Sequence, residues 1–421
     1  MIETRAYTDF SQIVHAAANP LRVPVNATIE VTHRCPLTCA HCYNNLPMND
    51  AQARAGELTL DEHRRVIDDL AELGCLWLLY TGGEIFARAD FLDIYRHARH
   101  AGMFLTLFTN ATLITDRVAD MLAEAPPFDI EVTLYGATQQ TYEALTGIPG
   151  SYERCMRGIE RLLERKLPLK LKTVGVTINR HEIRAMRDIA ESLGAHFKFD
   201  PMINPRIDCS ASPLAVRMTP AEIVALDLED PERVAEWRRL GSIAGPSELL
   251  ETDTPQIYDC GGGVNSFALD PEGNMTICVL SHVDTYNVRN GSVREGWEKF
   301  LLGVRTRPAT RITKCTRCAL KSLCGSCAAN AELENGDPEA PVDFLCRTAH
   351  LRAEVFGVQV RPHGDCEYCE GGLRREWVDR SADDVRLRAP QLLAAIDTMQ
   401  LPATDAGGSC ATGGCSGCAV K

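Results

Sequence analysis

The sequence predicts an α/β fold over the first half of the chain, followed by a smaller cysteine-rich region. Three observations predict this organisation. Short apolar runs alternate with amphipathic segments between residues 25 and 205, most of the 18 cysteines fall in spaced groups, and 45% of the 421 residues are hydrophobic. That apolar content suffices for one large core or two moderate ones. Strands joined by crossover helices imply a parallel sheet, whose ligand sites lie at the carboxyl ends of its strands.

Six apolar runs are the predicted strands. They lie near residues 27–32, 76–80, 103–108, 129–135, 170–178 and 196–200. Helices are expected between them, near residues 60–73, 91–101, 116–124, 152–165 and 182–193. The first of these helices has clear signals at both ends, because Thr59 and Glu62 form a capping-box pattern and Gly74 follows the last apolar residue.

Residues 206–255 are predicted to form a helical bridge that packs the two halves together. Thr219-Pro220 and Asp230-Pro231 both place a capping residue before a proline, which is favoured at the first position of a helix.

Composition and charge exclude several classes of protein. The net charge is −13, from 44 basic and 57 acidic residues, whereas a nucleic-acid binder would show a basic surface. No apolar stretch approaches membrane-spanning length, and the first residues lack the pattern of a secretion signal. Grouped cysteines in such a chain favour metal ligation over disulfides, so we expect a cytoplasmic, oxygen-sensitive protein.

The most informative segment is Cys35-Pro-Leu-Thr-Cys39-Ala-His-Cys42-Tyr43, directly after the first predicted strand. A four-iron, four-sulfur cluster normally takes four thiolates, and this loop offers three. One iron would then be open to a reactive ligand. The alternative is a zinc site with His41 as the fourth ligand, or three unrelated buried thiols.

A second motif favours the cluster. Thr81-Gly82-Gly83-Glu84 follows the next predicted strand. The two motifs in this order resemble the radical S-adenosylmethionine (radical SAM) enzymes. The resemblance implies a partial (β/α)6 barrel over residues 25–205 and a 4Fe-4S cluster on Cys35, Cys39 and Cys42. In that family the open iron chelates SAM, and one electron cleaves it to a 5′-deoxyadenosyl radical.

The resemblance also implies where SAM binds. The expected contacts come from the cysteine loop, the Gly-Gly-Glu motif and the next two strand ends: Tyr43, Gly82, Gly83, Glu84, Thr109, Asn110, Thr133 and Tyr135. The glycines would let the backbone approach the ligand without a Cβ clash. Tyr135 stands where the family often has an aspartate, and Leu145-Thr146-Gly147 occupies the neighbourhood of the family's frequent arginine, so the contact to the carboxylate of SAM is left open.

Seven later cysteines form a second pattern: Cys260, Cys278, Cys315, Cys318, Cys324, Cys327 and Cys346. Their order resembles the SPASM domain, a C-terminal extension of some radical SAM enzymes, here expected over residues 256–360. The resemblance implies two auxiliary iron–sulfur clusters, an outer one on Cys315, Cys318, Cys324 and Cys346 and an inner one on Cys260, Cys278 and Cys327. The family's usual Cys-x3-Cys spacing is Cys-x2-Cys between Cys324 and Cys327, which leaves the loop geometry open.

The inner cluster would lack a fourth thiolate. Residues 361–421 form a Cys/Gly-rich extension with further thiols at Cys366, Cys369, Cys410, Cys415 and Cys418. A tail cysteine could close the inner cluster, or the tail could build a separate zinc or iron–sulfur site or stay disordered. Cys75 and Cys155 are interpreted as packed thiols, and Cys209 is unassigned.

The resemblance implies hydrogen-atom abstraction from a ribosomally made peptide, giving a thioether or carbon–carbon crosslink or an oxidation. Residues 1–24 are only an N-terminal extension, so a separate leader-binding protein is expected, with a flavodoxin or ferredoxin-type electron donor. One alternative is a tetrapyrrole or quinone cofactor biosynthesis enzyme. Another is a non-catalytic iron–sulfur electron carrier, against which the Gly-Gly-Glu motif argues. The sequence predicts no catalytic acid or base.

Overall fold

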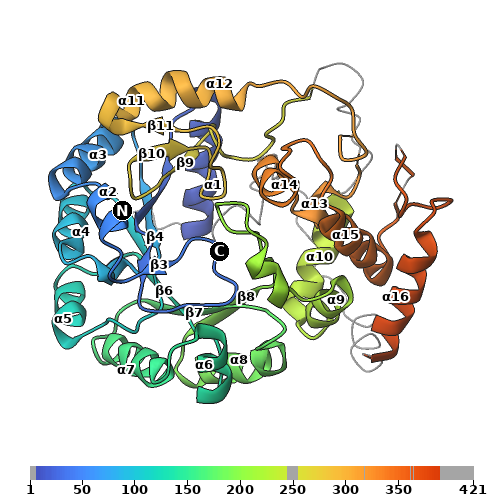
Figure 1. The fold of residues 1–421 in the computed structure, drawn as a ribbon, viewed down its shortest axis with the longest axis horizontal. Coiled ribbons are helices and arrows are strands. Elements are labelled where there is room, and N and C mark those ends of the chain that lie inside the picture. The colour runs from blue at the N-terminus through green and yellow to red at the C-terminus, as the bar shows by residue number, and fades with distance from the viewer. Residues whose placement is uncertain (1–5, 244–254, 317, 361, 364, 389–421) are drawn as a thin grey trace. The chain divides into compact units, whose positions relative to one another are not determined.

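The computed structural model describes residues 6–243, 255–316, 318–360, 362–363 and 365–388. The chain divides into two compact units, each built from two segments. The first contains residues up to 217 and residues 261–306, and the second contains residues 218–260 and those from 307 onward. Figure 1 shows the fold.

All six predicted strands are present and form consecutive parallel strands of one sheet in the first unit. They are β1 (Asn26–Thr32), β4 (Trp77–Gly82), β5 (Phe104–Thr109), β6 (Asp129–Thr133), β7 (Leu169–Val174) and β8 (His196–Asp200), paired in that order. Two short strands, β2 (Arg34–Cys35) and β3 (Leu46–Pro47), pair separately beside the end of β1.

Helices ring the curved sheet on its outer side (Figure 1). They are α2 (Ala51–Gly56), α3 (Leu60–Glu72), α4 (Phe91–His100), α5 (Asp116–Glu124), α6 (Gln139–Thr146), α7 (Ser151–Glu164) and α8 (Ile183–Ser192). The predicted capping box at Thr59 and Glu62 is confirmed, and Gly74 follows α3 with a φ of +90°. Helix α3 buries Val66, Ile67 and Leu70 on the face toward the sheet, as the apolar spacing predicts.

The first unit also contains elements that the sequence did not predict. Helix α1 (Tyr7–Ala18) lies in the N-terminal extension. Strands β9 (Ser266–Leu269), β10 (Asn274–Thr276) and β11 (Tyr286–Asn287) extend the sheet beyond β1, followed by α11 (Val293–Glu295), a π-helix (Gly296–Phe300) and α12 (Leu301–Arg305).

The compact units therefore differ from the predicted domain boundaries. Strand β9 pairs in parallel with β1, so residues 261–306 belong with the barrel although the cysteine pattern groups them with the region from 256. Most of the predicted bridge instead belongs with the cysteine-rich region. Cysteine spacing contains no information about strand pairing, which decides this division.

The second unit is helical. Its helices are α9 (Pro220–Leu228), α10 (Pro231–Ile243), α13 (Lys321–Cys324), α14 (Ala328–Asn335), α15 (Asp343–Phe356) and α16 (Arg375–Arg388). Both predicted helix starts are confirmed, and α9 has a capping box at Thr219. Helix α15 is buried on nearly every side and packs Leu351 and Val355 against Val224 of α9. At the centre, Arg352 donates to the fully buried Asp227 at 2.8 Å.

Candidate functional site

The cysteine loop begins where β1 ends, and the structure brings its three thiols together. Cys35 and Cys39 are buried in one apolar cluster, and Cys42 packs against it. The backbone N–H groups of Thr38 and Ala40 donate to carbonyl oxygens at the end of α6, at 2.9 and 3.1 Å. Burial raises the pKa of the Cys35 and Cys39 thiols, so a bound cation would be needed to hold them as thiolates.

The Gly-Gly-Glu turn packs directly on the start of this loop. The N–H of Gly83 donates to the Thr32 carbonyl at 2.7 Å, and the N–H of Glu84 donates to the Arg34 carbonyl at 3.0 Å. A Cβ on Gly82 would lie 2.2 Å from the Thr32 oxygen, and one on Gly83 would lie 2.5 Å from the Arg34 oxygen. The glycines therefore admit the backbone of the neighbouring loop, which joins the two motifs, and their contact with SAM stays a prediction.

Glu84 connects the predicted SAM-binding residues to one another. Its carboxylate is fully buried and accepts hydrogen bonds from Thr109 Oγ1 at 2.7 Å and from the backbone N–H of Asn110 at 2.8 Å. The side-chain amide of Asn110 in turn reaches Cys35 Sγ at 3.5 Å. Burial raises the pKa of Glu84 to about 7, although the hydrogen bonds from Asn110 and Thr109 act in the opposite direction. The ends of β4 and β5 therefore meet at this carboxylate, and Asn110 connects them to the cysteine loop.

The two predicted tyrosines lie on different sides of the loop. Tyr43 donates to the Glu30 carboxylate of β1 at 2.7 Å, and Asn44 donates to the same oxygen at 2.6 Å. Glu30 therefore helps to position the loop, a role the sequence analysis missed. Tyr135 packs against the cysteine cluster and lies 5.3 Å from the His41 ring, centroid to centroid. The phenol of Tyr135 therefore occupies the position where the family often has a carboxylate.

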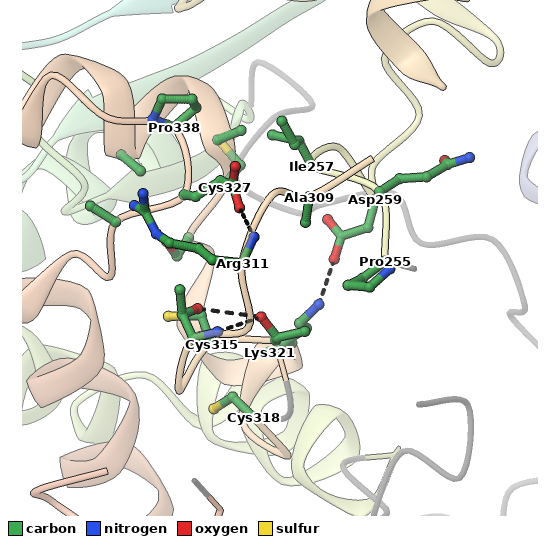
Figure 2. A pocket seen from close by; sticks show the side chains of 18 of the residues that line it. Pro255, Ile257, Asp259, Ala309, Arg311, Cys315, Cys318, Lys321, Cys327 and Pro338 are labelled. Atoms are coloured by element: carbon green, nitrogen blue, oxygen red, sulfur yellow. Dashed lines mark hydrogen bonds and ion pairs between the residues drawn. The ribbon is translucent and has the colours of Figure 1, made fainter. Parts of the chain in front are cut away.

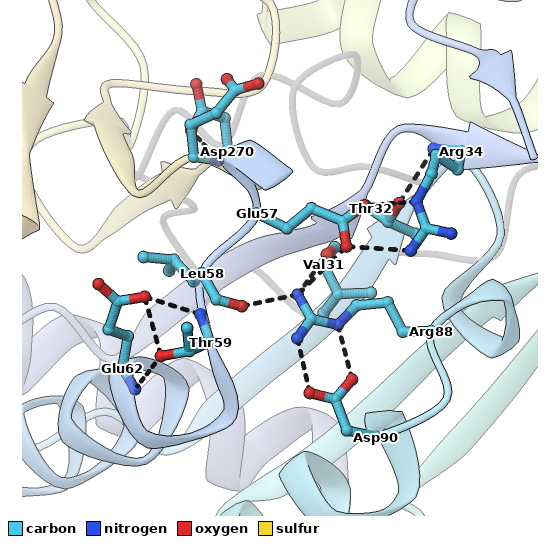
Figure 3. A network of polar contacts seen from close by, with 12 residues as sticks. Val31, Thr32, Arg34, Glu57, Leu58, Thr59, Glu62, Arg88, Asp90 and Asp270 are labelled. Carbon is cyan, nitrogen blue, oxygen red and sulfur yellow. Dashed lines mark hydrogen bonds and ion pairs between the residues drawn. The ribbon is translucent and has the colours of Figure 1, made fainter. Parts of the chain in front are cut away.

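A buried ion network supports both motifs from the side (Figure 3). The Arg34 guanidinium donates to both oxygens of Glu57, at 2.8 and 3.0 Å, and Thr32 also donates to Glu57. Arg88, which follows the Gly-Gly-Glu turn, lies 3.6 Å from Glu57 and pairs bidentately with Asp90. Because two cations meet two anions, the network is neutral, as burial requires.

A second charged group lies on the neighbouring strands, and the sequence analysis did not single it out. Thr133 ends β6 in register with Lys172 of β7. Glu131, two residues before it, pairs with Lys172 at 3.2 Å and with Lys198 of β8 at 2.6 Å. Burial lowers the pKa of Lys172 to about 7. Charged and apolar residues alternate along β6 and β7, and this alternation is the sequence signal that could have indicated the charged group.

In the second unit, four predicted cluster ligands line one pocket (Figure 2). They are Cys315, Cys318, Cys324 and Cys327. Beside them, Lys321 pairs with Asp259 at 3.0 Å. Three of these cysteines are expected ligands of the outer cluster, and the fourth, Cys327, is an expected ligand of the inner cluster.

The remaining predicted ligands are distributed differently. Cys346 lies on α15, in an apolar cluster with Cys366 and Cys369. Cys260 belongs to the second unit and Cys278 to the first, so the inner ligand set stays a prediction. Cys410, Cys415 and Cys418 lie outside the described residues. Among the residues that the structure describes, no helix is long and apolar enough to cross a membrane.

Comparison with known proteins now identifies the class. A model of the radical SAM superfamily matches residues 29–190, which include the cysteine loop and the Gly-Gly-Glu turn. PqqA peptide cyclase of Bradyrhizobium diazoefficiens is 30% identical over 356 residues, covering 81% of this chain and 90% of the relative. The chain belongs to the radical SAM superfamily. It is a radical SAM enzyme, which uses a 4Fe-4S cluster and SAM, and this contradicts the electron-carrier alternative.

Two further similarities bear on the fold and the substrate. The AdoMet-dependent heme synthase of Methanosarcina barkeri is 28% identical over 337 residues, covering 73% of this chain and 92% of that protein. The SAM-bound structure of SuiB from Streptococcus suis superimposes with a TM-score of 0.60 at 16% identity, covering 82% of each chain. The predicted α/β partial barrel with a C-terminal cysteine-rich region is confirmed.

Proposed function

We propose that this enzyme modifies a ribosomally made peptide and installs a thioether or carbon–carbon crosslink or an oxidation. The observation that carries the proposal is the similarity to PqqA peptide cyclase, which extends over 90% of that relative and thus beyond the barrel. The fold supports it, since SuiB has been solved with its precursor peptide SuiA and covers 82% of this chain.

Within this proposal, Cys35, Cys39 and Cys42 hold the cluster that cleaves SAM reductively. Three thiols from one loop, two buried and one half-buried, lie next to the polar Asn110 side chain and fit that donor set. Glu84 accepts a hydrogen bond from the SAM amine, positioned for this by Thr109 and the Asn110 backbone. Gly82, Gly83, Tyr43, Thr133 and Tyr135 are the other proposed contacts, and Gly82 and Gly83 would act by joining the turn to the cysteine loop. The apolar surroundings of the cysteine loop limit access of water to the site.

The auxiliary clusters and partners belong to the same proposal. Two clusters on Cys260, Cys278, Cys315, Cys318, Cys324, Cys327 and Cys346 would take the surplus electron or bind a substrate thiolate. The pocket lined by Cys315, Cys318, Cys324 and Cys327 supports metal ligation in this region. A separate leader-binding protein and a flavodoxin or ferredoxin-type donor remain proposed partners.

A tetrapyrrole is the second candidate substrate class. The similarity to the heme synthase of M. barkeri favours it, because it covers 92% of that enzyme. A quinone cofactor precursor stays within the same alternative.

The deciding experiment offers both substrate classes to the reduced holoenzyme with SAM. Short cysteine-containing peptides encoded beside its gene form one arm, and carboxylated tetrapyrroles form the other. We expect a peptide to stimulate 5′-deoxyadenosine formation and to lose two hydrogen atoms, measured by mass spectrometry. A tetrapyrrole that changes mass while every peptide stays unchanged would overturn the proposal. A Cys35→Ala variant provides the inactive control.

A further inference from the structure

Four side chains that the predicted clusters do not use converge in the second unit. His350 lies on α15, and His363, Cys366 and Cys369 lie on the segment before α16. One ligand atom from each lies within 4.8 Å of all the others. The exposed fractions of the four residues run from 2% to 8%, so the group is enclosed by protein.

We propose that these four residues bind one zinc ion in a structural Cys2His2 site. His350 Nε2 lies 3.4 Å from Cys366 Sγ and 3.6 Å from Cys369 Sγ, and His363 Nδ1 lies 3.5 Å from Cys369 Sγ. Zinc binds thiolate sulfur at about 2.3 Å and imidazole nitrogen at about 2.0 Å, so a tetrahedral centre separates the two atoms by about 3.6 Å. All three sulfur–nitrogen distances agree with that separation.

The tautomer of His350 is set for metal binding. Its Nδ1 lies 2.8 Å from the Cys346 carbonyl oxygen, which can only accept a hydrogen bond. Nδ1 therefore carries the proton, and the Nε2 lone pair faces the two sulfurs. A backbone carbonyl that holds the far nitrogen is the usual support of a zinc-bound histidine.

The backbone of the second ligand segment folds as tight turns that bring its side chains inward. The N–H of Cys366 donates to the His363 carbonyl at 3.3 Å, and the N–H of Cys369 donates to the Cys366 carbonyl at 3.3 Å. Gly372 closes the segment, because a Cβ there would lie 2.5 Å from the Glu367 oxygen. Two thiolates and two neutral imidazoles around a divalent cation make a neutral centre, which suits a buried position.

The ligand chemistry separates this site from the auxiliary clusters. Iron–sulfur cubes normally take four thiolates, whereas zinc accepts mixed nitrogen and sulfur sets. Cys346 borders the site, because its Sγ lies 3.7 Å from His350 Nδ1 and its thiol also contacts that of Cys366, but it is not one of the four residues whose ligand atoms converge. The four residues have the spacing His350-x12-His363-x2-Cys366-x2-Cys369 in the sequence. The ion would tie α15 to the segment that leads into α16.

Metal analysis of the full-length, anaerobically purified enzyme tests the proposal. We expect one zinc per chain in addition to the iron. The double variant Cys366→Ser/Cys369→Ser should lose this zinc and keep its iron. Cys209→Ser, which removes an exposed thiol of the other unit, is the matched control and should keep both. A double variant that retains zinc, or that loses a cluster's worth of iron instead, would overturn the proposal.

Two further measurements apply if the double variant fails to fold. Zinc-edge X-ray absorption of the wild-type enzyme should show two sulfur and two nitrogen neighbours, and a four-sulfur shell would contradict the site. His363→Cys should retain zinc with three sulfur neighbours, because the position still supplies a ligand, whereas His363→Ala should lose zinc occupancy. Equal zinc content in the His363→Cys and His363→Ala variants would also contradict the proposed zinc site.

Discussion

The two cysteine-rich regions of this enzyme use the same type of ligand but gain their shape in different ways. The loop at Cys35–Cys42 is held by strand ends, by the Gly-Gly-Glu turn and by the ion network around Glu57. The segment from residue 315 to 369 includes helices α13, α14 and α15, but Cys315, Cys318, Cys366 and Cys369 lie outside these helices, in short turns. A regular sheet can position a site before any metal binds. Short turns supply fewer contacts, so metal binding should contribute more to folding there.

The largest expected effect concerns the first region. Replacing Cys35, Cys39 and Cys42 together with alanine should abolish 5′-deoxyadenosine formation and remove one cluster's worth of iron. The unit should remain folded, because the strands and the Glu57 network do not depend on the thiols. Circular dichroism and iron analysis check both points. Unchanged SAM cleavage would contradict the assignment of the loop, and global unfolding would contradict the contrast between the regions.

The next prediction concerns the ion network. Glu57→Ala leaves Arg34 and Arg88 without their shared carboxylate in a buried site. Removing one partner of a buried ion pair typically costs about 3–5 kcal/mol, so chemical denaturation should show a loss of that size. Asp61→Ala removes the partner of Arg64 in an exposed pair nearby and should leave the unfolding free energy unchanged. Equal effects of the two variants would show that the network does not support the site.

The smallest effect is expected for Glu84→Gln, which keeps the shape but removes the charge. Loss of a charge-assisted hydrogen bond costs roughly 1.5–3 kcal/mol, so SAM affinity should fall about 10- to 100-fold. Iron content should stay constant, which separates this variant from the triple one. Equilibrium binding of SAM under anaerobic conditions measures the effect, and an unchanged Kd would mean that Glu84 only supports the fold.

The same residue predicts a pH dependence. Burial raises the pKa of Glu84 to about 7, so its carboxylate becomes populated as pH rises through that value. If SAM binds the ionised form, affinity should increase about tenfold per pH unit below 7 and level off above it. In the absence of SAM, the free energy of unfolding should change with pH in the opposite direction. Protonated Glu84 stabilises the folded state at low pH, and this stabilisation is lost as pH rises through about 7. If the affinity of the wild-type enzyme for SAM did not change with pH, this result would contradict the proposed role of Glu84.

Much of the regular structure of both units could be predicted from local patterns. The six parallel strands, the capping box at Thr59 and the helix starts at Thr219 and Asp230 all follow from residue spacing and end signals. The additional strands β9, β10 and β11 could not be predicted this way. They are two to four residues long, and the pairing of β9 with β1 joins positions more than two hundred residues apart.

The sequence by itself determined the family, since the cysteine loop, the Gly-Gly-Glu motif and their order along the chain are local patterns. Only the tertiary structure showed three contacts between residues far apart in sequence. Gly82 and Gly83 accommodate the Thr32–Arg34 backbone, and Glu84 accepts hydrogen bonds from Thr109 and Asn110. The His350 side chain lies beside the thiols of Cys366 and Cys369. The physical reason is common to these cases. A motif specifies which atoms are available, whereas distances between atoms far apart in sequence depend on how strands pair and helices pack.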